Sequence, residues 1–128
     1  MGYCGMGTQF TVDASRRLVV LTFDGPTDVP ELERIGSMIL AHPDFEPSFS
    51  QIIDCSGVTG VNFSPDTIRE VIRGEKTFSP TSKRVIVAPQ HHIYGLARMA
   101  QAFAEKTLPN LMVVRSMAEA LEVLGEVK

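Results

Sequence analysis

The stretch Gln51-Ile-Ile-Asp-Cys-Ser-Gly-Val-Thr-Gly-Val-Asn-Phe-Ser-Pro-Asp66 decides the fold of this chain. Phe49 to Cys55 has a short, wholly apolar centre, which predicts a strand covered on both faces. Ser56 to Phe63 contains two glycines and predicts a loop. Ser64 and Pro65 then predict the start of a helix, because serine caps the first N–H groups and proline fits the first helical position.

The same alternation of strand and helix runs along the rest of the chain. The other predicted strands are Gln9 to Asp13, Leu18 to Phe23, Lys83 to Ala88 and Leu111 to Val114; the helices begin at Thr27 or Asp28, at Ser64, near Ile93 and after Ser116. The order β-β-α-β-α-β-α-β-α predicts an α/β fold, with a mostly parallel sheet and an antiparallel hairpin at its N-terminal side. We expect residues 1–128 to form one domain, with residues 1–8 disordered.

Composition excludes several classes of protein. The net charge is −3, with 12 basic and 15 acidic residues, so nothing favours nucleic acid as a partner. The apolar runs are far shorter than the roughly 20 residues that span a bilayer, so stable membrane insertion is not expected. Cys4 and Cys55 have no metal-binding or redox spacing, which favours a reducing, cytoplasmic location.

The central stretch resembles the STAS domain of anti-sigma-factor antagonists. That family shows a strand that ends in an aspartate and a small polar residue, a loop, and then Asp-Ser-Ser-Gly at a helix start. Here Asn62 stands for the aspartate of that motif, Phe63 for the first serine and Pro65 for the glycine. Ser64 falls where the family has its regulatory phosphoserine, so the resemblance implies a phospho-acceptor position.

The second half of the chain is similar to a related group of small bacterial proteins. These combine STAS features with those of the CRAL-TRIO lipid-carrier fold. The matching text is Val85-Ile-Val-Ala-Pro89, Tyr94-Gly-Leu-Ala-Arg98-Met99 and Val113-Val-Arg-Ser-Met-Ala-Glu-Ala-Leu121. This second resemblance implies a carrier of an apolar or amphipathic ligand as an alternative function. Together the two resemblances cover about residues 9 to 125.

Polar residues follow the predicted parallel strands, whose carboxyl ends should lie along one edge of the sheet. Asp54 is either a site carboxylate or the acceptor of an Asx-type turn. Ser64 is either a phosphate acceptor or a plain helix cap, and the two roles are compatible. Ser56 and Asn62 are further candidates for contact with a ligand or partner.

The segment after the fourth predicted strand supplies the remaining candidates. His91 and His92 are adjacent and point apart, with no ligand-spaced partner, so we expect no metal site and interpret them as loop-capping or ligand-contacting residues. Tyr94 and Arg98 are four residues apart and share a helix face. They either hold an anionic ligand or form a local pair.

No enzymatic signature is present: the chain lacks a nucleophile elbow and both glycine-rich phosphate loops. We therefore assign no catalytic residue and no cofactor. The first hypothesis is a non-catalytic STAS-like regulatory or protein-interaction module that binds a protein partner at residues 55–66. The alternative is the small apolar-ligand carrier, and homodimer formation through exposed apolar surface is a third possibility.

Overall fold

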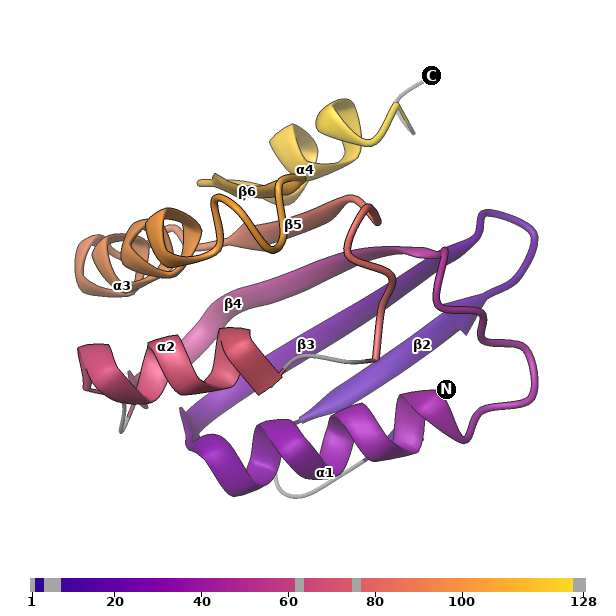
Figure 1. The fold of residues 1–128 in the computed structure, drawn as a ribbon, viewed down its shortest axis with the longest axis horizontal. Coiled ribbons are helices and arrows are strands. Elements are labelled where there is room, and N and C mark those ends of the chain that lie inside the picture. Colours follow the sequence, from indigo (N-terminus) through magenta and orange to yellow (C-terminus); the bar gives the residue numbers. More distant parts are fainter. Residues whose placement is uncertain (1, 4–7, 62–63, 75–76, 126–128) are drawn as a thin grey trace.

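The computed structural model describes residues 2–3, 8–61, 64–74 and 77–125, and these form one mixed sheet flanked by four helices (Figure 1). The strands are β1 (Gly2–Tyr3), β2 (Gln9–Asp13), β3 (Leu18–Thr27), β4 (Ser50–Val61), β5 (Arg84–Val87) and β6 (Leu111–Val114). The helices are α1 (Val29–Leu40), α2 (Pro65–Gly74), α3 (His91–Phe103) and α4 (Met117–Val123). None of these helices is long and apolar enough to cross a bilayer.

The strands lie in the sheet in their order along the chain, from β1 to β6. Strands β2 and β3 form the predicted antiparallel hairpin, and β3, β4, β5 and β6 pair in parallel. The predicted α/β fold class is therefore confirmed. One strand is additional: Gly2 and Tyr3 pair with Phe10 and Gln9 at the free edge of β2. Residues 1 and 4–7 lie outside the described ranges, so the disorder expected for residues 1–8 stays a prediction.

Side chains alternate between the two faces of the sheet, and each face has its own core. On one face Val19, Leu21 and Phe23 of β3 pack with residues of α1 and α3. On the other face the neighbouring positions Leu18 and Val20 of β3 pack with α4. A third cluster, made of Ile72, Ile86, Ala104, Leu108 and Leu111, joins α2 to the end of α3 and to β6. Since α4 has only seven residues, it covers its face of the sheet incompletely.

Three helices begin at the predicted positions, and each has a capping side chain there. The side chain of Asp28 accepts a hydrogen bond from the Glu31 N–H, and the side chain of Ser116 accepts one from the Glu119 N–H. Ser64 Oγ accepts one from the Thr67 N–H at 3.1 Å. Each contact satisfies an N–H group that has no partner within its helix.

The predicted loop at Ser56 to Phe63 is wrong, because β4 continues to Val61. Similarly, β3 continues past the predicted strand end at Phe23, through Asp24-Gly25-Pro26, and ends at Thr27. The two strands stay paired by means of two bulges, between Thr22 and Asp24 and between Gly25 and Pro26, and at each bulge β4 uses one more residue than β3. The glycines thus mark irregular strand pairing and not the end of a strand.

Gly57 is required at the first bulge for steric reasons. A Cβ atom there would lie 2.7 Å from Asp24 Oδ1, 3.1 Å from the Phe23 carbonyl oxygen and 3.2 Å from Asp24 Cα. The carboxylate could rotate away, but the two backbone atoms could not. Gly60, in the same strand, has no atom within 4 Å of the corresponding position.

We expect Gly57→Ala to reduce the free energy of unfolding by about 1–3 kcal/mol, because the β3 backbone must shift to admit a methyl group. Gly60→Ala is the matched control and should leave stability within about 0.5 kcal/mol of the parent. Urea denaturation of the three proteins measures both values. Equal stability of the two variants would contradict the close approach at Gly57.

Candidate functional site

A hollow of about 450 Å³, lined by five polar residues and by Phe23 and Gly57, lies beside the first bulge. Its lining comes from three neighbouring strands: Gln9, Thr22, Phe23, Asp24, Asp54, Ser56 and Gly57. Thr22 and Asp54 follow Val20 and Ile52 by two residues, and therefore lie on the face of the sheet that α4 covers in part. The hollow therefore lies on the face of the sheet that carries α4, in a part of that face where every lining residue comes from a strand.

Asp54 and Ser56 form a local hydrogen-bonded unit within this hollow. Asp54 Oδ1 accepts from the Ser56 N–H at 3.0 Å and from the Ser56 hydroxyl at 2.6 Å. This is the Asx-type arrangement that the sequence offered as one interpretation of Asp54. This contact holds the carboxylate beside Ser56, at the first bulge, where the pairing register of β3 and β4 changes.

Gln90 is the residue that sequence reasoning missed. Strand β5 ends its pairing at Val87 opposite Asp54, so the following residues of β4 have no strand on that side in the described part of the chain. The side-chain nitrogen Nε2 of Gln90 lies there and donates to three backbone carbonyl oxygens. They are those of Cys55 at 3.1 Å, Ser56 at 2.8 Å and Val58 at 3.2 Å. We call this contact the Gln90 clasp.

One signal in the sequence could have indicated the clasp. Gln90 occupies the N-cap position of α3, but its side chain makes no capping hydrogen bond. Glutamine is a poor N-cap, since the short side chains of Ser, Thr, Asp and Asn are the ones that reach the N2 and N3 N–H groups. A long amide at that position therefore has a different role, which here is to pair the β4 carbonyls.

Cys55 lies next to the hollow and points toward the opposite face of the sheet, where it packs on the main core. Burial, with a further contribution from the negative charge of Asp54, raises the pKa of its thiol to about 12. The thiol is therefore protonated and a poor nucleophile at neutral pH.

A second group of polar residues gathers around Tyr94. Arg115, which follows β6, has its guanidinium carbon 4.2 Å from the centre of the Tyr94 ring. Arg98 Nη1 lies 3.4 Å from the Tyr94 hydroxyl, which confirms that these two residues share a helix face. His91 Nδ1 lies 3.5 Å from Arg115 Nη2. We call these four residues the Tyr94 cluster.

The two histidines lie in the first turn of α3 and not in a loop, because the helix begins two residues earlier than predicted. His91 joins the Tyr94 cluster, whereas His92 is exposed and is not brought together with it. Across the described residues, no group of three or more His, Cys, Asp or Glu side chains has the arrangement of a metal site.

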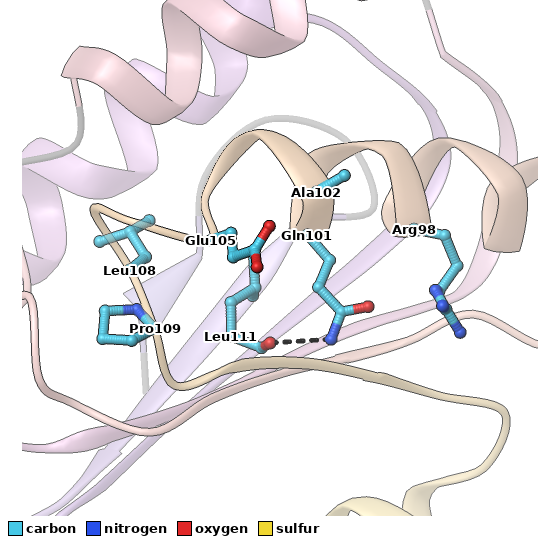
Figure 2. A pocket seen from close by; sticks show the side chains of 7 residues that line it. All are labelled: Arg98, Gln101, Ala102, Glu105, Leu108, Pro109 and Leu111. Carbon is cyan, nitrogen blue, oxygen red and sulfur yellow. Dashed lines mark hydrogen bonds between the residues drawn. The ribbon is translucent and has the colours of Figure 1, made fainter.

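A second hollow, of about 360 Å³, runs between α3 and the edge strand β6 (Figure 2). Arg98 lies at one end and Leu108 and Pro109 lie at the other. Between them the Gln101 amide donates a hydrogen bond to the Leu111 oxygen at 3.1 Å. Arg98 is thus shared by this hollow and the Tyr94 cluster.

Ser64 is remote from Asp54, although both belong to the central stretch of the sequence. Val61 follows Asp54 by seven positions in β4, which corresponds to about 20 Å along a strand. Ser64 is exposed and lies 2.9 Å, Oγ to Oγ1, from Thr67. Asn62, the remaining candidate, lies outside the described residues.

Comparison with known proteins identifies the fold. The crystal structure of an uncharacterized protein from the DUF3478 family of Shewanella loihica PV-4, described as having a SpoIIAA-like fold, superposes with a TM-score of 0.61. The alignment covers 97% of this chain and 98% of that one, at 17% sequence identity. No protein-family model and no curated protein matches the chain. The chain therefore has a SpoIIAA-like, that is STAS-like, fold.

Removing the Gln90 clasp should loosen the end of β4. We expect Gln90→Leu to lower the free energy of unfolding by about 1–3 kcal/mol, since partly buried carbonyls lose their donor. Hydrogen exchange should become faster at residues 55–61 and stay unchanged in the β2–β3 hairpin. Gln101→Leu, which removes one amide contact elsewhere, is the control. Unchanged exchange at residues 55–61 would show that the clasp is not needed.

The buried thiol predicts that stability falls at high pH. In the unfolded chain Cys55 ionises near its ordinary pKa of 9.0, whereas in the folded chain it stays protonated up to about 12. Above pH 9 the unfolded state therefore binds fewer protons, and raising the pH favours unfolding by up to about 1.4 kcal/mol per pH unit. Below pH 9 this contribution to stability is fully present.

Urea denaturation between pH 8 and pH 10.5 tests this dependence. The parent should lose more stability over that range than Cys55→Ala, which lacks the titrating group. The comparison uses the change with pH and not the absolute stability, because alanine also leaves a small cavity. Parallel pH profiles for the two proteins would show that Cys55 is not protected from ionisation.

Proposed function

We propose that this protein is a non-catalytic, cytoplasmic, STAS-like module that acts by binding a protein partner through the start of α2. The observation that carries this proposal is the position of Ser64. It is an exposed residue that caps α2 directly after the strand β4 of a SpoIIAA-like fold. The resemblance of the central stretch to anti-sigma-factor antagonists puts their regulatory phosphoserine at the same place.

The geometry of the cap is compatible with regulation by phosphate. Ser64 Oγ accepts the Thr67 N–H, so a phosphoryl group on it would lie at the positive end of the α2 dipole. Asp66 already places one negative charge in the first turn, and it pairs with Arg69 at 3.0 Å. A phosphate at Ser64 would compete for Arg69 and change the charge of the surface offered to a partner.

The outer face of α2 has the composition of an exposed recognition surface. Two ion pairs cross it, Asp66 with Arg69 and Glu70 with Arg73, and three of the four side chains are more than half exposed. Exposed pairs of this kind contribute little to stability. They set a pattern of charge that a complementary protein surface can recognise.

The alternative, a carrier of an apolar ligand, has less support. The hollow beside β4 is lined by carboxylates, hydroxyls and an amide, and the hollow beside α3 contains Arg98, Gln101 and Glu105. An apolar ligand would prefer a pocket lined mainly by hydrophobic side chains. No specific contact favours homodimer formation either, although Leu40 and Met112 are exposed apolar residues.

Site-specific photo-crosslinking in cells of the source organism tests the proposed surface. A photoreactive residue at Glu70 on α2 should give one discrete protein adduct, and the same residue at Glu122 on α4 should give none. Ser64→Asp keeps a capping side chain while adding charge, so it should change the adduct yield by about tenfold without lowering the melting temperature. Identical adduct patterns from Glu70 and Glu122 would refute the proposal.

Mass spectrometry of the protein recovered from the same cells tests the phosphate version separately. Modification on Ser64 supports it. If no growth condition gives a modified Ser64, the phospho-switch is ruled out, while an adduct specific to Glu70 would still support the binding module.

A further inference from the structure

Six of the eight arginines of the chain fall into two sets by their partners. Four of them pair with a carboxylate: Arg17 with Glu46, Arg34 with Glu31, Arg69 with Asp66 and Arg73 with Glu70. Arg98 and Arg115 make no ion pair with any residue in the described ranges. These two are also the arginines that share Tyr94. Two positive charges without an ion-pair partner in the described ranges therefore lie against one aromatic side chain, Arg115 over its ring and Arg98 at its hydroxyl.

Arg115 is held in place by neutral groups. Its guanidinium lies over the Tyr94 ring at 4.2 Å, and Nη1 lies 3.5 Å from the Pro89 oxygen. These contacts orient the planar group but leave its charge uncompensated. The carboxylate of Glu119 is used elsewhere, since it accepts the Arg115 backbone N–H at 3.1 Å and lies 3.4 Å from the Ser116 hydroxyl.

The first turn of α3 adds backbone donors beside Arg115. His91, its first residue, has its Nδ1 3.5 Å from Arg115 Nη2, and this ring nitrogen accepts because a guanidinium only donates. The N-cap residue Gln90 makes no capping hydrogen bond, because its side chain is turned toward the β4 carbonyls. The N–H groups of the first turn thus keep their partial positive charge beside Arg115. In α1 and α4, by contrast, the side chain of the N-cap residue accepts a hydrogen bond from the helix.

We infer that the Tyr94 cluster, made of His91, Tyr94, Arg98 and Arg115, is a binding site for the phosphoryl group of a small phosphate monoester or of inorganic phosphate. The number of donors decides between anions. A carboxylate offers two oxygens and one charge, whereas a phosphoryl group offers three acceptor oxygens and a charge of about −1.5 to −2. The three oxygens and the larger charge of a phosphoryl group match two guanidinium groups together with a helix start that has no side-chain cap.

The hollow next to Arg98 gives room for the rest of such a ligand. It extends from Arg98 along α3 to Leu108 and Pro109, over about 360 Å³ (Figure 2). A ligand with its phosphate at the Tyr94 cluster would place its organic part along Gln101. This site does not involve Ser64 or α2, so it goes beyond the function proposed above. A test can refute the site without refuting that function.

Titration of the full chain with inorganic phosphate and with phenyl phosphate, followed by two-dimensional NMR at constant ionic strength, tests the site. Up to about 10 mM ligand, the amides of residues 91–93 and the side-chain N–H groups of Arg98 and Arg115 should shift and saturate. Arg98→Gln with Arg115→Gln should weaken binding by at least about tenfold. If the double variant does not fold, the test uses Arg98→Gln alone, which changes an exposed residue. This single variant should weaken binding by a smaller factor.

The matched control is Arg34→Gln with Arg73→Gln, which removes the same charge from α1 and α2 and should leave binding unchanged. Tighter binding of phenyl phosphate assigns the site to a phosphate monoester, and equal binding assigns it to inorganic phosphate. Three results would overturn the inference: no saturation with either probe, equal loss in the control variant, or benzoate binding as tightly as phenyl phosphate.

Discussion

The close approach of β3 and β4 at Gly57 is the constraint on which the rest of the structure depends. Gly57 has no Cβ atom, so its backbone can lie close to the Phe23 carbonyl. The pairing of the two strands therefore continues past the first bulge. This continuation carries Val58 into the main core beside Phe23. It also carries the chain to Val61, so that α2 starts well beyond the point where β5 has ended.

The extension of β4 explains why the edge of the sheet holds two separate polar sites. The Gln90 clasp stands between them, with its amide on the β4 carbonyls and its backbone at the start of α3. On one side lies the acidic hollow of Asp24 and Asp54, on the incompletely covered face of the sheet. On the other side lies the cationic Tyr94 cluster. The carboxylates of the hollow and the guanidinium groups of the Tyr94 cluster therefore form separate groups of side chains.

The sequence predicted the parts of the fold that depend on local chemistry. Apolar runs such as Ile52-Ile53 gave the strands, and Asp28, Ser64 and Ser116 gave the helix starts, because an N-cap acts only on its own first turn. The pattern failed at Gly57 and Gly60. A glycine that ends a strand and a glycine that allows two strands to approach look the same in one sequence, and only the partner strand distinguishes them.

The site was predicted less completely for the same reason. Asp54 with Ser56, and Tyr94 with Arg98, are close in sequence, and both contacts are present. The contacts of Gln90 with Ser56 and of Arg115 with Tyr94 join residues more than 20 positions apart, and no spacing rule reaches that far.

The sequential order of the strands has a consequence for folding. Each strand pairs with the one before it, so no strand must be inserted between two that are already joined. Such a sheet has a low contact order for a parallel fold and can grow from its N-terminal hairpin as the chain leaves the ribosome.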